Sequence, residues 1–151
     1  MKIESNSKPL PVEIERHGEQ AEVILREHIT EETGEEPVYT YDEYRLTVPY
    51  RENLLQSVEA AKAAWLEKAK ASEYEALASA IREKRDRLLA ESDREMSLDR
   101  LKLDVSSAMG LFASLASVFR GPWAVYRQAL RDLPAQEGFP YDVKFPGKPE
   151  R

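Results

Sequence analysis

Two residue types that build many catalytic and metal sites are missing or rare in this chain. The 151 residues include no cysteine, and the two histidines are His17 and His28. A chain without cysteine has no disulfide, no thiolate metal ligand and no thiol nucleophile. The histidines lack the HExxH spacing or any similar spacing that favours zinc, so we expect no bound metal.

Glycine-based catalytic motifs are absent as well. None of the six glycines belongs to a GxSxG nucleophile elbow, a GxxxxGK[ST] phosphate loop or a GxGxxG dinucleotide loop. The carboxylates gather in runs that look solvent-facing, such as Glu31, Glu32, Glu35 and Glu36, which is typical of solubility charges rather than of acid–base catalysts. We therefore expect no catalytic residue and no cofactor, and a protein that is not an enzyme.

The chain also lacks a long apolar run. Its longest uncharged stretch, from Val105 to Phe119, has 15 residues and includes four serines, whereas a membrane span needs about 20 apolar residues. Charges are scattered through the first residues, which therefore lack the apolar centre of a signal peptide. We expect no membrane insertion and a protein that stays in the cytoplasm.

The charges are unevenly distributed. The total is −6, and residues 1–50 carry 12 acidic and 5 basic side chains. The densest basic cluster, Arg82 to Arg87, is interleaved with Glu83 and Asp86, which is typical of a solvated helix face. Because binding to a phosphate backbone relies on clustered Lys and Arg, we expect no nucleic-acid partner.

The N-terminal part has the pattern of short strands. Apolar runs from Pro9 to Glu15, Ala21 to Ile29 and Pro37 to Pro49 are separated by turn signals at His17-Gly18 and Thr33-Gly34. In the third run one face collects the apolar side chains, as in a half-buried antiparallel strand. These patterns predict a three-strand meander, whose apolar face a helix must cover.

A helical pattern follows from Glu52. Leu54, Val58, Ala61 and Trp65 stand at i, i+4, i+7 and i+11, which predicts one helix with Trp65 as the anchor of the core. A second apolar stripe, centred on Ile81, lies on a rotated face, so the helix either bends near residues 71–73 or is two helices. We place a domain boundary there: residues 1–71 form a meander-plus-helix domain, and residues 72–151 form a helical module.

The stretch from Val105 to Phe119 has apolar residues on more than one face, after a helix start predicted by a Ser97 cap. Such a helix must be buried. Two interpretations stay open, namely burial in the core of its own module and contact with another chain, either a partner protein or a second copy of this one.

The C-terminal residues predict one short helix followed by an extended tail. Pro122 suits the first turn of a helix, and Pro134 ends it. Later prolines keep the chain out of helix while aromatic residues alternate sides as in a strand. The expected fold class is therefore α+β: an antiparallel meander packed on a helix, then a helical module with a proline- and aromatic-rich tail.

Two strings in this half carry a resemblance. RDRLLAESD, from Arg85 to Asp93, and YRQALRDLPAQEGFP, from Tyr126 to Pro140, resemble the C-terminal module of the phage tail assembly chaperone family. The resemblance spans about Ile81 to Pro149. It implies a phage or prophage protein that binds an unassembled tail or tail-fibre protein in the host cytoplasm. The alternative is a tail, baseplate or fibre-associated component that stays in the virion tail.

The C-terminal residues also supply the candidate partner-binding set. Arg127, Gln128 and Arg131 are expected to project from the helix as a basic edge, and Arg is favoured at protein interfaces. The tail aromatics have the character of binding hot spots, although the tail equally fits folding back over its own domain. The predicted partner-binding residues are Trp123, Tyr126, Arg127, Gln128, Arg131, Phe139, Tyr141 and Phe145.

Overall fold

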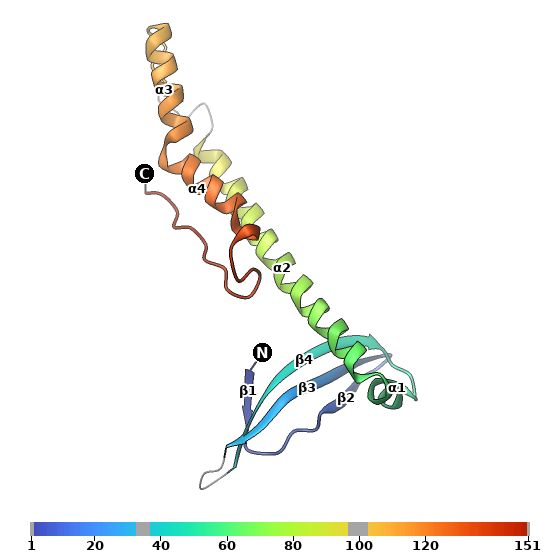
Figure 1. The fold of residues 1–151 in the computed structure, drawn as a ribbon. Helices are drawn as coiled ribbons and strands as arrows, with labels where there is room; N and C mark the ends of the chain where they lie inside the picture. The colour runs from blue at the N-terminus through green and yellow to red at the C-terminus, as the bar shows by residue number, and fades with distance from the viewer. Residues whose placement is uncertain (1, 33–36, 97–102, 151) are drawn as a thin grey trace. The chain divides into compact units, whose positions relative to one another are not determined.

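The structure is a computed structural model that describes residues 2–32, 37–96 and 103–150. The chain divides into two compact units, Met1–Glu75 and Ala76–Arg151 (Figure 1). Helix α2 (Lys62–Glu95) contributes residues to both units. The predicted turn at Thr33-Gly34 and the predicted cap at Ser97 lie outside the described residues.

The first unit contains a four-stranded antiparallel sheet. Its strands are β1 (Lys2–Ser5), β2 (Val12–His17), β3 (Gln20–Glu32) and β4 (Val38–Pro49), in the order β1-β4-β3-β2. The meander of β2, β3 and β4 was predicted. Strand β1 was missed because its four residues include one apolar side chain, Ile3, which is too short a pattern to read. The α+β class is confirmed.

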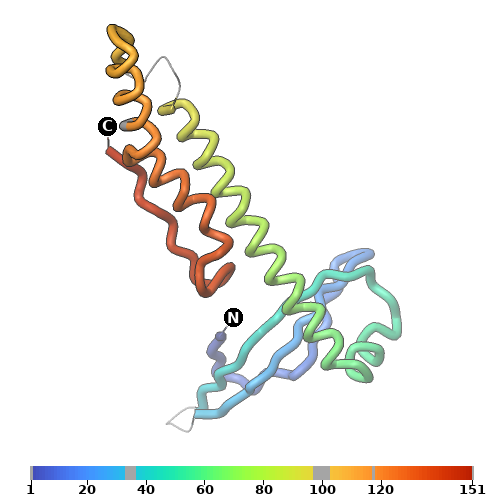
Figure 2. Tube along the Cα trace, turned by 45° about the horizontal axis from the view of Figure 1, so that its top comes forward, coloured from blue at the N-terminus to red at the C-terminus, as the bar shows by residue number. Residues whose placement is uncertain are grey.

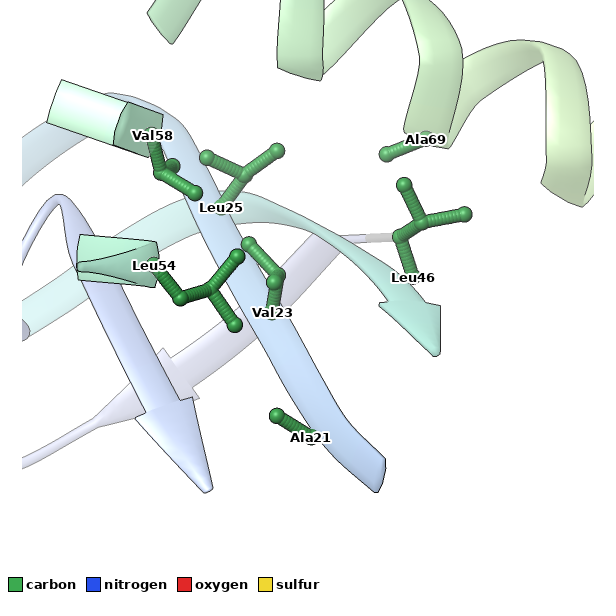
Figure 3. Close-up of a cluster of buried hydrophobic side chains, with 7 residues drawn as sticks. All are labelled: Ala21, Val23, Leu25, Leu46, Leu54, Val58 and Ala69. Atoms are coloured by element: carbon green, nitrogen blue, oxygen red, sulfur yellow. The ribbon is translucent and has the colours of Figure 1, made fainter. Parts of the chain in front are cut away.

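One face of this sheet forms the core of the unit. Alternate residues of β3, beginning with Ala21, point to this face, and Val23 pairs with Leu46 of β4. Figure 3 shows Leu54 and Val58 of helix α1 (Leu54–Ala60) pointing toward Val23 and Leu25. The helix therefore covers the apolar face, as the alternation required.

The predicted single helix is interrupted at Ala61, which is a correction to the sequence analysis. Helix α1 ends at Ala60, and Ala61 leaves the helical region with φ −131° and ψ 37°. Ala61 is exposed, and Trp65 is half-buried against the core rather than its central anchor. The 3.6-residue spacing did not reveal the break because Ala61 itself favours helix. Beyond it, α2 is one helix, so the expected alternative of two helices meeting near residues 71–73 is wrong.

The opposite face of the sheet carries a ladder of ion pairs. The Arg26 guanidinium lies 2.9 Å from the Glu13 carboxylate and 2.8 Å from the Glu43 carboxylate. Arg45 lies 2.8 Å from both Glu43 and Glu22. Burial raises the pKa of the Glu43 carboxyl, but hydrogen bonds from Arg26 and Arg45 outweigh burial and hold that pKa below its ordinary value. Alternating charges thus pair with one another on this face of the sheet.

The second unit is helical. It contains the C-terminal part of α2, α3 (Ala108–Arg120), α4 (Pro122–Arg131) and the 3₁₀ turn η1 (Leu133–Ala135). Gly121 ends α3, and Pro122 opens α4 as predicted. The tail after η1 runs back beside α4 (Figure 2). A core of Tyr126, Leu130 and Leu133 joins these segments.

Replacing Leu54 with Ala tests the core of the first unit. Leu54 is 1% exposed and its neighbour Leu55 is 44% exposed, so the pair offers a matched control. We expect Leu54→Ala to lower the free energy of unfolding by about 2–5 kcal/mol, because it removes buried apolar area and leaves a cavity. Leu55→Ala should change it by less than about 1 kcal/mol. Urea denaturation followed by circular dichroism measures both, and equal effects would show that α1 packs through a different face.

Replacing Glu43 with Gln tests the ion-pair ladder. At neutral pH we expect a loss of about 1–3 kcal/mol, since the buried Arg26 guanidinium and the exposed Arg45 guanidinium both lose a charged acceptor. Because the folded-state pKa of Glu43 is lowered, its contribution to the free energy of unfolding is fully present at pH values above the unfolded carboxyl pKa of roughly 4.3. The contribution disappears as the pH falls through the lower folded-state value.

The pH dependence supplies the control for the same experiment. The difference in unfolding free energy between wild type and Glu43→Gln should shrink as the pH is lowered from 7 toward 3. The exposed Glu15→Gln change on β2 should have little effect at either pH. A difference that stays constant across this range would contradict the ladder.

Candidate partner-binding surface

Most of the aromatic residues predicted to bind a partner are packed inside the second unit. Tyr126 is 4% exposed, and its ring meets that of Trp123 edge to face, with centroids 5.8 Å apart. Trp123 and Phe145 pack against the core formed with Leu130 and Leu133. The structure therefore shows the alternative in which the tail folds back over its own module.

Cations of α2 also hold the tail. The Lys84 ammonium lies 4.1 Å from the centroid of the Phe145 ring, and the Arg82 guanidinium lies 5.8 Å from that of Phe139. Contacts of this kind stabilise by about 0.5–1 kcal/mol at exposed sites. Tyr141 is the exposed member of the predicted aromatic set.

A glutamine side chain fastens the tail to the turn before it. The Gln136 carbonyl oxygen accepts from the Lys144 backbone N–H at 3.0 Å, and the Gln136 amide donates to the Lys144 carbonyl at 3.0 Å. Between them Gly138 has φ +86°, and its carbonyl accepts from the N–H groups of Tyr141 and Asp142. A Cβ at Gly138 would lie 3.2 Å from Asp142, so this turn requires glycine.

Arg127 faces α2 instead of projecting from the module, which corrects the expected basic edge. Its guanidinium donates to the Ser92 hydroxyl at 2.7 Å and to the Asp93 carboxylate, and it reaches the Leu89 carbonyl at 3.5 Å. The two strings that carry the family resemblance thus meet at Arg127. The two strings occur together because Arg127 of the second string attaches α4 to the α2 residues of the first.

Gln128 and Arg131 do lie on the outer surface of α4. Gln128 donates to Asp132 at 2.9 Å, one turn further along the helix. Among the residues that the structure describes, Arg131 makes no ion pair and no hydrogen bond through its side chain. Of the predicted set, these two residues and Tyr141 remain accessible.

Helix α3 exposes large apolar side chains, which does not fit burial in the core of its own module, the first of the two interpretations left open by the sequence. Phe112 and Phe119 are each 71% exposed, and Met109 and Val125 are also exposed. Met109, Phe112 and Phe119 are separated by three and seven residues, so they lie on one side of the helix. The sequence analysis identified this stretch by its lack of charge. The sequence does not show which other helices are free to pack against it.

An open cleft of about 540 Å³ lies between α3 and α4. Phe119 and Val125, with Met96 just after the end of α2, form its apolar part, and Arg127, Gln128 and Arg131 form its polar side. Residues 105–131 contain three arginines and no acidic residue, in a chain whose net charge is −6. This surface is therefore apolar and positively charged, as suits the binding of a protein segment.

The described residues show neither a metal site nor a membrane span. Among residues 2–32, 37–96 and 103–150, no group of acidic or histidine side chains converges as a metal ion would require. Within those ranges, no helix has both the length and the hydropathy of a membrane span.

The second unit is thus a helical module with an apolar binding surface and a tail folded against its core. Residues 78–150 match the model of a family described as phage tail assembly chaperone protein. The match confirms the predicted resemblance and nearly coincides with the second compact unit. Searches of curated proteins and of solved structures gave no match. This match indicates a role in phage tail assembly.

Replacing Gln136 with Ala tests how the tail is attached. Two hydrogen bonds to the Lys144 backbone would be lost, and each such bond stabilises by about 1 kcal/mol. We expect the Lys144 amide to exchange its hydrogen roughly fivefold faster or more, as measured by NMR. Gln128→Ala, which removes a surface contact on α4, is the matched control and should leave this amide unchanged. Unaltered exchange in Gln136→Ala would mean that the tail is held by other contacts.

Proposed function

We propose that this protein is a non-enzymatic tail assembly chaperone that binds an unassembled tail or tail-fibre protein. Its binding surface is the exposed apolar side of α3 together with the cleft beside α4. The observation that carries the proposal is the exposure of Phe112 and Phe119 in the same unit that matches the family. Monomers rarely leave apolar patches of more than a few hundred Å² without a partner.

The size of this surface suits reversible binding. Burial of a phenylalanine side chain contributes about 1.5–3 kcal/mol. Burial of two such rings together with Met109 and Val125 gives a favourable free energy of binding. The loss of translational and rotational freedom largely offsets this free energy. The complex would form while the client exposes its own apolar surface, and it would dissociate when assembly covers that surface.

This mechanism differs from the one read from the sequence in the residues that touch the client. Trp123, Tyr126 and Phe145 shape and stabilise the module. Gln128, Arg131 and Tyr141 are accessible for contact. The aromatic tail therefore mainly stabilises α4, and α3 is the element on which the client docks.

The alternative is a tail, baseplate or fibre-associated component that remains in the virion. A permanent subunit also presents apolar surface, although its interface is usually larger. Mass spectrometry of purified particles separates the two functions. A chaperone is absent from finished particles and present in the host cytoplasm, whereas a component occurs at fixed copy number in the virion tail.

The two compact units also bear on the domain organisation of the protein. We propose that they are separate domains joined along α2, because each has its own buried cluster. The family match covers the second domain.

Substitution of the α3 aromatics tests client binding. Phe112→Asp combined with Phe119→Asp should reduce capture of the tail and tail-fibre proteins encoded by neighbouring genes by tenfold or more. Both rings are exposed, so the melting temperature should change little. Leu10→Asp, an exposed apolar site in the first unit, is the control and should retain capture. Pull-down with purified client candidates measures the effect. Undiminished capture by the double variant would overturn the proposed surface.

A further inference from the structure

We infer that the cleft between α3 and α4 binds an acidic amphipathic helix of the client protein. This inference rests on the proposed function and adds the chemistry of the bound segment. It is based on the lining of the cleft, where Phe119 and Val125 form an apolar wall next to the arginine side chains of α4.

The charge of this region selects an acidic ligand. Residues 105–131 have a net charge of +3. Arg127 is paired with Asp93. By contrast, in the part of the chain that the structure describes, Arg120 and Arg131 make no ion pair. A guanidinium without a protein partner favours a carboxylate, which it can bind with two parallel hydrogen bonds.

The apolar pattern selects a helix. Met109, Phe112 and Phe119 extend over ten residues of α3, which corresponds to about 15 Å along its axis. Phe119, at the C-terminal end of this apolar side, lines the cleft, and α4 begins directly where α3 ends (Figure 1). A helix with apolar residues at i, i+3, i+4 and i+7 matches a surface of this length.

A second copy of this chain is a poorer occupant of the same surface. In a two-fold symmetric contact the same patch occurs on both sides. The arginines of the two copies would then face each other, while the nearby carboxylates of Asp93 and Asp132 are already bonded to Arg127 and Gln128 within their own copy. Like charges at close range repel by about 1 kcal/mol per pair even in water. The client segment, in contrast, can bring the missing carboxylates.

Two labelled peptides test the inference on the full-length protein. Both are amphipathic helices of about 15 residues with the same leucine stripe. One carries glutamate and the other lysine at the flanking positions. Fluorescence anisotropy measures the dissociation constant of each. We expect the glutamate peptide to bind about tenfold more tightly than the lysine peptide at low salt, and the difference to shrink in high salt.

Variants of the protein locate the effect. Arg131→Glu should weaken binding of the glutamate peptide about fivefold or more and strengthen binding of the lysine peptide. Arg87→Glu makes the same charge change at an exposed position of α2 outside the cleft and should leave both affinities unchanged. Equal affinities for the two peptides, or equal effects of the two variants, would overturn the inference.

The oligomeric state and client capture distinguish the remaining outcomes. If sedimentation shows a dimer that Phe112→Asp converts to a monomer, a second copy occupies the surface and the inference is wrong. If the neighbouring tail protein is captured but the peptides show no charge preference, the inference fails and the proposed function stands. Charge preference without capture of any tail protein would support the cleft assignment and overturn the proposed function.

Discussion

The guanidinium of Arg127, which donates to Ser92 and Asp93, holds α4 against α2, and the rest of the C-terminal module depends on this attachment. Because α4 is held there, its apolar stripe of Tyr126 and Leu130 faces inward. The tail then closes over that stripe through Phe145. The charged hydrogen bonds of Arg127, at the edge of a small apolar core, thus fix the orientation of α4. The apolar contacts alone do not determine that orientation.

This arrangement explains why α3 is exposed. The core around Leu130 already receives Leu88, Leu89, Trp123, Val143 and Phe145. No apolar element remains among the described residues to cover Phe112 and Phe119. The exposed helix is therefore a direct consequence of how the tail packs. It also explains how one module can be stable in isolation and still present an apolar surface to a client.

The α+β class, the β2–β4 meander and the helix start at Pro122 could be predicted because each rests on a local period or a single strong residue preference. The break at Ala61 could not, since alanine favours helix and the interruption arises where α1 docks on the sheet. Arg127 was expected on the surface for a similar reason. Helical spacing places it beside the apolar stripe, but the position of α2 decides whether that side meets solvent or another helix.

The sequence by itself determined where most of the helices and strands form, which residues are apolar enough to need cover, and that the charged residues of 105–131 are all positive. These properties depend on neighbours within a few positions along the chain. Tertiary structure alone decided which apolar stripe is covered and which is left for a partner. That choice depends on contacts such as Arg127 with Asp93 and Gln136 with Lys144. Those contacts place the tail residues Val143 and Phe145 against the core, while Phe112 and Phe119 of α3 stay exposed.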